Sequence, residues 1–189
     1  VKVEFSVMSF DNVLANVQSG KADIAIAGIS VTDERKKVYD FSDSYYTSEN
    51  VVIVKKDKVN DYTSTDSLAK QTVGTQKGSV QETVAKKQIP KASVVSLTSN
   101  GEMINELKSG QLQAVVLAQA IAEGYLAQND DLTLANFNLK SDSTDASAAA
   151  TRKGSDDLLK EINAVIKETK DSGKFDQWLK EASTYKQSK

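Results

Sequence analysis

The stretch AGISVTDERKKVYDFSDSYY, residues 27–46, carries the strongest structural signal in the chain. It follows the apolar run IAIA at positions 24–27, which we interpret as a buried β-strand that breaks at Gly28. Thr32, followed by two acidic residues, predicts the start of a helix, and Arg35 lies one turn further on. The guanidinium of Arg35 would then lie close to the end of the strand and to small residues with free backbone N–H groups. That is the chemistry needed to hold a small carboxylate.

Arginine is rare in this chain, because only Arg35 and Arg152 among the 24 Lys and Arg residues are arginines. A guanidinium can bind a carboxylate through two parallel N–H bonds, which an ammonium group cannot do. The alternative is a salt bridge on the helix surface with Glu34 or Asp40, since most charge clusters are solvated faces. At this point both interpretations of Arg35 remain open.

Composition excludes several kinds of site. A length of 189 residues, with 39% hydrophobic and 26% charged residues, fits an ordinary globular protein of one large domain or two small ones. The net charge of −2 gives no reason to expect a nucleic-acid partner, and no apolar run approaches the roughly 18 residues of a membrane span. The chain has neither Cys nor His, which excludes thiolate metal sites and Ser–His–Asp triads. We expect no metal, no cofactor and no catalytic residue.

The start of the chain is strand-like over residues 1–5 and has no initiating Met. We therefore expect that an upstream part has been removed or was never included.

One internal repeat runs through the chain. VLANVQSGKADIAIAG, residues 13–28, and MINELKSGQLQAVVLA, residues 103–118, match at a constant offset. Each copy predicts an amphipathic helix, a Ser-Gly stop whose glycine can be left-handed, and a buried strand. Chance is the alternative, because helix–Gly–strand is common in α/β proteins. The shared register favours two similarly built lobes, with Ile26 and Val116 in different sheets.

The rest of the chain alternates predicted strands and helices, which favours mainly parallel sheets. Further strands are predicted at 51–55, 71–75, 93–97 and 132–139, with a small-residue strand or crossover at 146–151. Helices are predicted after the capping boxes Ser79/Glu82 and Ser99/Glu102, at 119–127 and along 158–166. A short last helix would carry Phe175, Trp178 and Leu179, and we interpret this aromatic stripe as core packing rather than a ligand platform.

Four segments, in this order, resemble the extracytoplasmic solute-binding proteins of polar amino-acid ABC transporters, bacterial extracellular solute-binding protein family 3. The segments are SGKADIAIAGISVTDERKKVYDFSDSYYTSENVVIV, VGTQKGSVQE, LKSGQLQAVVLAQAIAEGYL and RKGSDDLLKEINAVIKETKDSGKFDQWLKE. The resemblance covers nearly the whole chain, and its first segment is the most specific.

The resemblance implies an α/β, two-lobed type II periplasmic-binding-protein-like fold with a ligand cleft and two hinge crossovers. Lobe 1 would comprise residues 1–45 plus 151–189, and lobe 2 residues 46–150, with hinges near 45–50 and 146–150. One copy of the repeat then falls in each lobe. Relatives begin with an extra strand and helix that cover the ligand side chain, and we expect this chain to lack that N-terminal unit.

The resemblance also implies that both lobes hold the α-carboxylate of a ligand. The matching positions are Gly28, Ser30 and Arg35 in lobe 1 and Gly78 and Ser79 in lobe 2. Gly78 and Ser79 precede a helix, whose partly positive N-terminus favours an anion. Ser79 would also be explained by a capping role alone, and the two roles are compatible. Gln76 would either reach the ligand side chain or face solvent.

One position departs from the family pattern. Relatives usually carry an acidic residue after the second repeat strand, where it pairs with the α-ammonium of the ligand, but this chain has Ala118 followed by Gln119. A buried ammonium group without an anion is costly. Either another residue supplies the charge, the ligand is not a standard α-amino acid, or the alignment slips by one residue.

The function that the resemblance implies is binding of a small polar ligand, an amino acid, outside the cytoplasmic membrane and its delivery to an ABC transporter permease. The protein would be periplasmic or a cell-surface lipoprotein, monomeric when complete, with dimerisation or strand exchange open to the truncated chain. One alternative is an enzyme on the same fold, dehydratase-like, against which the missing acid at Ala118 and the absence of His both weigh. The other is a sensor ligand-binding domain, which would need a fused membrane segment.

Overall fold

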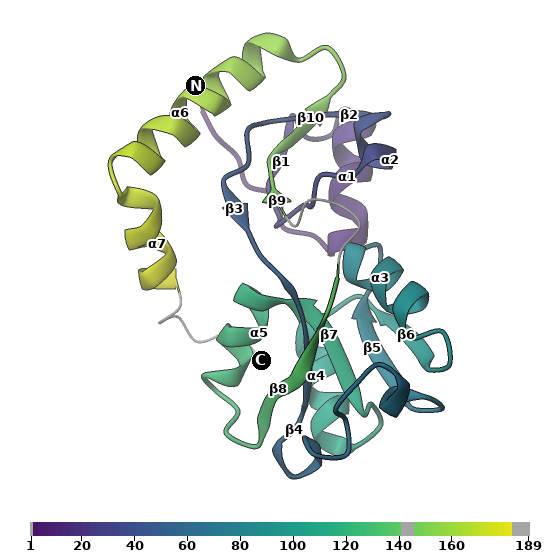
Figure 1. The fold of residues 1–189 in the computed structure, drawn as a ribbon. Helices are drawn as coiled ribbons and strands as arrows, with labels where there is room; N and C mark the ends of the chain where they lie inside the picture. Colours follow the sequence, from purple (N-terminus) through teal and green to yellow (C-terminus); the bar gives the residue numbers. More distant parts are fainter. Residues whose placement is uncertain (1, 141–145, 183–189) are drawn as a thin grey trace.

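The computed structural model describes residues 2–140 and 146–182 and contains two units built around separate sheets (Figure 1). We call the part around the three-stranded sheet β1-β10-β2 the small unit, and the part around the five-stranded sheet β6-β5-β7-β4-β8 the large unit. A two-stranded pair, β3 (Tyr46–Thr47) with β9 (Ala146–Ser147), lies in the chain between the two sheets.

The small unit consists of α1 (Phe10–Gln18), β1 (Ile24–Ala25), α2 (Asp33–Lys36), β2 (Tyr39–Phe41) and β10 (Ala150–Arg152). Its strands are all antiparallel. Its buried apolar residues come from α1, from the strands and from the loop after β1; they are Val17, Ala25, Ile29, Tyr39 and Ala150. Phe10, Val13 and Leu14 of α1 pack against this cluster, so the predicted apolar face of the helix is confirmed.

Two expectations for the small unit are wrong. The run at 24–27 is not a buried strand, because only Ala25 is buried, whereas Ile24 is 36% and Ile26 68% exposed. The reason is that β1 is a two-residue edge strand, paired on one side with β10. Residues 2–9 form neither a strand nor a helix, and their apolar side chains at Val3, Phe5 and Val7 are exposed.

The large unit follows the predicted order of elements. It contains β4 (Asn50–Lys55), β5 (Thr72–Gln76), α3 (Val80–Gln88), β6 (Ser93–Leu97), α4 (Asn100–Ser109), β7 (Ala114–Ala118), α5 (Gln119–Leu126) and β8 (Leu132–Leu139), with short 3-10 turns at Lys56–Lys58 and Asp66–Leu68. Strand β5 is parallel to β6 and β7, but β4 is antiparallel to both of its neighbours. The expectation of mainly parallel sheets is therefore wrong, because β4 leaves the small unit and β8 runs back towards it beside β4 (Figure 1).

Helices cover both faces of the large sheet, and alternation along β4 explains why nearly all of it is buried. Val52 and Val54 face the helix α3, where Val84, Ala85 and Ile89 complete one apolar cluster. Val51 and Ile53 point to the other face and join Met103, Ile104 and Leu107 of α4 and Ala122 of α5. The large unit thus has two apolar layers, and the small unit has one.

The internal repeat is present in the fold. In each copy a helix ends at a left-handed glycine, with φ of 76° at Gly20 and 85° at Gly110, and a strand follows. The strands are β1 in the small sheet and β7 in the large sheet, so the two copies belong to different sheets as the repeat predicts. Ile26 itself lies just beyond the end of β1.

The last two helices, α6 (Asp156–Asp171) and α7 (Lys174–Ala182), contact each other and lie along one side of the molecule (Figure 1). The interpretation of their aromatic stripe as core packing is wrong: no residue of α7 is buried, and Trp178 is 53% exposed. Val165 on the predicted apolar face of α6 is also exposed. The cause is that α6 and α7 follow each other end to end along one side of the molecule and cover little of either sheet (Figure 1).

Gly74 offers a test of packing in the large unit. A Cβ at this position in β5 would lie 2.5 Å from Cδ1 of Leu112 and 3.5 Å from both Sδ of Met103 and Cγ2 of Val115. We expect Gly74→Ala to lower the free energy of unfolding by about 1–3 kcal/mol, because a packed core must shift to admit the methyl group. Urea denaturation measures the change.

The matched control is Gly101→Ala in α4. A Cβ there would meet nothing nearer than 3.7 Å, and alanine favours a helix. Gly101→Ala should therefore leave stability unchanged or raise it slightly. Equal stabilities of the Gly74→Ala chain and the parent would show that the core around β5 is not tightly packed.

Candidate functional site

The loop that carries Ser30 is held by the strand pair between the sheets. Ser30 forms an isolated antiparallel bridge with Ser147, the N–H of Val31 donates to the carbonyl of Ala146, and the N–H of Ala148 donates to the carbonyl of Ile29. The predicted loop therefore has a fixed position at the junction of the two units.

The predicted helix start at Thr32 is confirmed, although α2 is only four residues long. The hydroxyl oxygen of Thr32 accepts a hydrogen bond from the N–H of Arg35 at 3.1 Å, which is the expected N-cap contact. This contact fixes the backbone of Arg35 one turn after the loop of Ser30.

The guanidinium of Arg35 spans the two units. Its Nη1 donates to the carbonyl oxygen of Ser30 at 2.7 Å, and its Nη2 donates to the carbonyl oxygen of Gly78 at 3.0 Å. Neither of these bonds goes to an acid, and Asp40 pairs with Lys153 instead. Burial lowers the pKa of Arg35 from its ordinary value. An anion placed beside the guanidinium would oppose that effect, so the environment suits a carboxylate.

Ser79 is the N-cap of α3, as predicted. Its hydroxyl accepts the N–H of Glu82 at 3.2 Å and donates to the carbonyl of Gln76 at 2.6 Å, and its own N–H also donates to that carbonyl. The capping interpretation is therefore confirmed. A carboxylate that bound the Ser79 hydroxyl would have to replace the carbonyl of Gln76 as its acceptor.

The capping box differs from its expected form. A carboxylate oxygen of Glu82 accepts the N–H of Gly78 at 2.8 Å rather than that of Ser79. Burial raises the pKa of Glu82, but hydrogen bonds from Lys86, from the Gly78 N–H and from Ser96 outweigh it, and the net shift is downwards. Glu82 therefore stays ionised and accepts the N–H of Gly78, a residue that the resemblance placed in the ligand site.

Gly28 has a left-handed backbone, with φ of 63°, and its N–H donates to the hydroxyl oxygen of Tyr45 at 3.2 Å. Sequence reasoning missed Tyr45 as a site residue. The signal was present in the quoted stretch, which ends in two tyrosines, but no local pattern links positions that far apart. Burial raises the pKa of Tyr45, with the Gly28 hydrogen bond acting in the opposite direction, so its hydroxyl is neutral at physiological pH.

The structure brings some of the predicted residues together more closely than others. Ser30, Arg35 and Gly78 are joined directly by hydrogen bonds, and Ser79 follows Gly78 in the same turn. Gly28 is tied to Tyr45 instead. Gln76 is the last residue of β5, and its carbonyl oxygen accepts the hydroxyl of Ser79.

Ala118 lies where β7 ends and is the N-cap residue of α5, with no side-chain capping bond. Asn50 is its partner in the neighbouring strand β4, and the buried Asn50 accepts a hydrogen bond from Gln81 at 2.7 Å. Ala118 therefore places no charge at the position where the family pattern has an acid.

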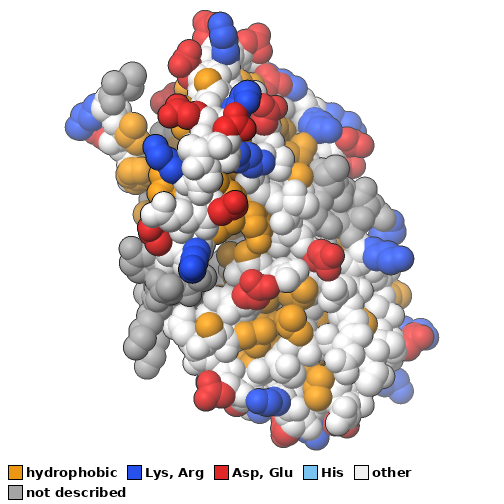
Figure 2. Space-filling view, turned by 60° about the vertical axis from the view of Figure 1, so that its left-hand side comes forward, with side chains coloured by type: hydrophobic (Ala, Val, Ile, Leu, Met, Phe, Trp, Pro, Cys, Tyr) orange, Lys and Arg blue, Asp and Glu red, His pale blue; other side chains and the backbone are white. Residues whose placement is uncertain are grey.

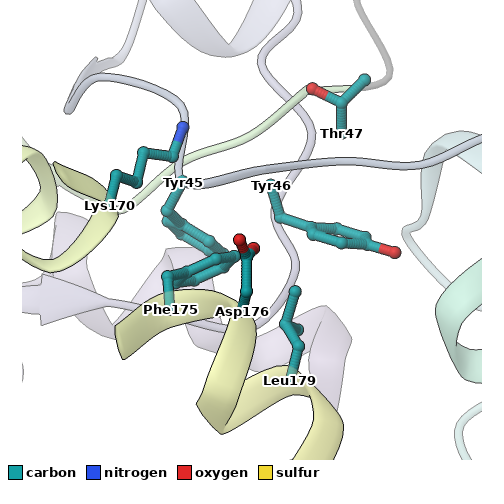
Figure 3. Close-up of a pocket in the computed structure, with 7 residues that line it drawn as sticks. All are labelled: Tyr45, Tyr46, Thr47, Lys170, Phe175, Asp176 and Leu179. Carbon is teal, nitrogen blue, oxygen red and sulfur yellow. The ribbon is translucent and has the colours of Figure 1, made fainter. Parts of the chain in front are cut away.

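A separate cavity of about 280 Å³ lies between the strand β3 and the helix α7 (Figure 3). It is lined by Tyr45, Tyr46, Thr47, Lys170, Phe175, Asp176 and Leu179. The ring of Phe175 lies 6.3 Å from that of Tyr45 and 6.5 Å from that of Tyr46. Tyr45 thus belongs both to this cavity, through its ring, and to the Gly28 loop, through its hydroxyl.

Two features are absent from residues 2–140 and 146–182. No helix in these ranges is both long and apolar enough to cross a bilayer. The same ranges hold no group of three or more His, Cys, Asp or Glu side chains placed to bind a metal. Figure 2 shows acidic and basic side chains interspersed on the face it presents.

Comparison with known proteins gives a family match over most of the chain. The model of the bacterial extracellular solute-binding proteins, family 3, matches residues 1–182. The arginine-binding extracellular protein ArtP of Bacillus subtilis (strain 168) is 33% identical over 183 residues, which are 95% of this chain and 70% of that protein. The ABC transporter glutamine-binding protein GlnH of the same organism is 32% identical, over 95% of this chain and 66% of that protein.

A solved structure resembles the whole chain. It is the amino acid ABC transporter substrate-binding protein AbpA from Streptococcus pneumoniae Canada MDR_19A, bound to L-arginine. The two chains are 46% identical with a TM-score of 0.95, over 100% of this chain and 79% of that one. The α/β periplasmic-binding fold is thereby confirmed. Across these three proteins, the chain spans from 66% to 79% of their lengths.

Proposed function

The chain belongs to the bacterial extracellular solute-binding proteins of family 3, and on that premise we propose that it binds an amino acid between its two units, with Arg35 as the main carboxylate anchor. The relatives described above are named for binding a solute and not for catalysis. The complete protein would act outside the cytoplasmic membrane and deliver its ligand to the permease of an ABC transporter.

The bridge made by Arg35 is the observation that carries the proposal. One guanidinium contacts backbone carbonyls of both units, Ser30 in one and Gly78 in the other. A carboxylate that enters here would accept two parallel N–H bonds from the guanidinium, which are stronger than bonds to neutral carbonyls. The N-terminus of the nine-residue helix α3 adds positive potential on the side of the large unit. Gly28, Ser30, Gly78, Ser79 and Gln76 complete the proposed site.

The first ligand to test is L-arginine. The neighbour at 46% identity is bound to L-arginine and one relative is named for arginine, whereas another is named for glutamine. These relatives agree on an amino acid and differ on its side chain. The carboxylate anchor would be common to all of them, since it does not involve the ligand side chain.

The two units are proposed to act as lobes that close on the ligand. The proposed boundaries are residues 1–45 plus 151–189 for one lobe and 46–150 for the other, with hinges near 45–50 and 146–150. Residues 1, 141–145 and 183–189 of these ranges lie outside the described residues. The pairing of β3 with β9 supports the hinge positions, because both crossing segments lie side by side there. Contacts to both lobes would shift the equilibrium towards the closed form.

Titration calorimetry tests the binding proposal with L-arginine, L-glutamine and L-histidine, and native mass spectrometry of the freshly purified chain would detect a carried-over ligand. Agmatine is the matched control, because it has the side chain of arginine without the carboxylate. We expect at least one amino acid to bind and agmatine to bind far more weakly than L-arginine. Equal affinity for agmatine and L-arginine would rule out a carboxylate anchor.

Self-association is a further proposal for this chain. Apolar side chains alternate with polar ones along residues 2–7, and Val3, Phe5 and Val7 are at least 70% exposed. An unpaired segment of this kind, next to short strands, favours pairing between copies. Light scattering coupled to size exclusion measures the mass, with Phe5→Lys as the variant that should reduce association. A monomer at all concentrations would contradict this proposal.

Tyr45→Phe tests the loop of Gly28. The substitution removes the acceptor of the Gly28 N–H and keeps the ring that contacts Phe175. We expect affinity for L-arginine to fall about twofold to tenfold, since one neutral hydrogen bond positions this loop. Calorimetry measures the change. Tyr46→Phe is the control, because Tyr46 has the same ring neighbour; equal losses in both variants would show that the Gly28 contact has no special role.

A further inference from the structure

An ion pair joins the two units beside the proposed carboxylate site. The Nζ of Lys77, in the loop between β5 and α3 of the large unit, lies 3.0 Å from Oδ2 of Asp11 in α1 of the small unit. The backbones also approach here, since a Cβ on Gly78 would lie 3.5 Å from the backbone Cα of Asp11. The contact is therefore made between the units and depends on how close they are.

Asp11 is the more enclosed partner. Its side chain is 17% exposed against 57% for Lys77, and its Oδ1 is buried without a hydrogen-bond partner in the described part of the chain. Hydrogen bonds from the Ser9 side chain and then from Lys77 lower the pKa of Asp11, against the opposing effect of desolvation. Asp11 is therefore charged at neutral pH, and Lys77 from the other unit balances that charge.

The same loop is held on its other side by Arg35. Lys77 contacts Asp11 of α1, and the next residue, Gly78, offers its carbonyl to Arg35 of α2. Two successive residues of the large unit are thus bound by two different elements of the small unit. Both contacts join protein atoms to protein atoms, so neither needs a ligand in order to form.

We propose that the Asp11–Lys77 ion pair is a latch that favours closure of the two units without taking part in ligand recognition, and so slows ligand release. This inference rests on the proposed function. Since the pair exists only where the units approach, its removal leaves Asp11 without its partner and shifts the population towards open forms. Apparent affinity then falls in proportion to the closed fraction. The alternative is an ion pair with no influence on closure, which is common at protein surfaces.

The chain has no Cys, so two introduced cysteines can be labelled specifically to measure the distance between the units. Lys37→Cys in the small unit and Thr83→Cys in the large unit change two exposed positions, and spin labels attached there report the distance between the units. In the ligand-free chain we expect Lys77→Ala to broaden the distance distribution towards longer distances. The charge exchange Asp11→Lys with Lys77→Asp should restore the parent distribution at least in part.

Lys86→Ala is the matched control, because Lys86 pairs with Glu82 inside the helix α3 and not across the units. It should leave the distances unchanged. Stopped-flow measurement with L-arginine should show release about twofold to fivefold faster in Lys77→Ala, with little change in the association rate. Distances identical to the parent in both Lys77→Ala and Asp11→Asn would overturn the latch.

The distance measurement and the binding measurement together separate failure of the latch from failure of the proposed function. If Lys77→Ala opens the units but the parent chain binds no amino acid, the latch stands and the binding proposal falls. If the parent binds L-arginine but the distances between the spin labels are the same in Lys77→Ala as in the parent, the binding proposal stands and the latch falls.

Discussion

Replacing Arg35 with alanine is expected to weaken the binding of L-arginine by about 30-fold to 1,000-fold, or roughly 2–4 kcal/mol. The substitution removes both N–H bonds offered to the ligand carboxylate. It also removes the contact with the Gly78 carbonyl, which links the two units. Arg35→Lys should restore only part of the affinity, since an ammonium group is a point donor and cannot match the planar fork. Titration calorimetry measures all three proteins.

The other arginine supplies the control. Arg152 donates to the carbonyl of Ala22 at 3.0 Å and pairs with Asp23, all within the small unit. Arg152→Ala should therefore change stability more than affinity. If Arg35→Ala binds L-arginine as tightly as the parent, Arg35 is not part of the site. If Arg35→Ala and Arg152→Ala lose similar affinity, the cause is damage to the small unit.

Local structure was predictable wherever a short pattern carries the physical cause. The left-handed glycines Gly20 and Gly110, and the caps at Thr32 and Ser79, each depend on residues within one turn. The core positions of α4 followed from helical spacing, because Met103, Ile104 and Leu107 face one sheet. In each case the interacting residues lie as close together in the chain as the residues of the pattern that predicts them.

What sequence reasoning missed depends on residues far apart in the chain. Tyr45 reaches Gly28 from 17 residues along the chain, inside the proposed lobe 1, whereas Lys77 reaches Asp11 because the two units are placed side by side. The exposure of Ile24, Ile26 and α7 was missed for a related reason. An apolar pattern shows that a face can be buried and not that a partner covers it. Gly28 and Gly78 were placed in the ligand site by resemblance, and their N–H groups have protein acceptors in the structure.

The second large effect is expected at Ala118, and it combines two physical terms. Ala118 is the N-cap of α5 and makes no side-chain capping bond, so an acid there would accept an N–H from the first turn of the helix. Ala118→Asp should raise the free energy of unfolding by about 0.5–2 kcal/mol for that reason. If the α-ammonium of the ligand lies here as the family pattern implies, the new carboxylate should also raise affinity for L-arginine, by about 1.5–3 kcal/mol.

Ala118→Asn separates the two terms, because asparagine caps a helix about as well as aspartate and carries no charge. We expect both variants to unfold at higher urea concentrations than the parent, and only Ala118→Asp to gain affinity in calorimetry. N-acetyl-L-arginine, which lacks the ammonium group, should gain nothing from either substitution. Loss of L-arginine binding in Ala118→Asp alone would mean that another acid already serves the ammonium and that the added charge is left unpaired. Stabilisation without any change in affinity would place the ammonium group away from α5.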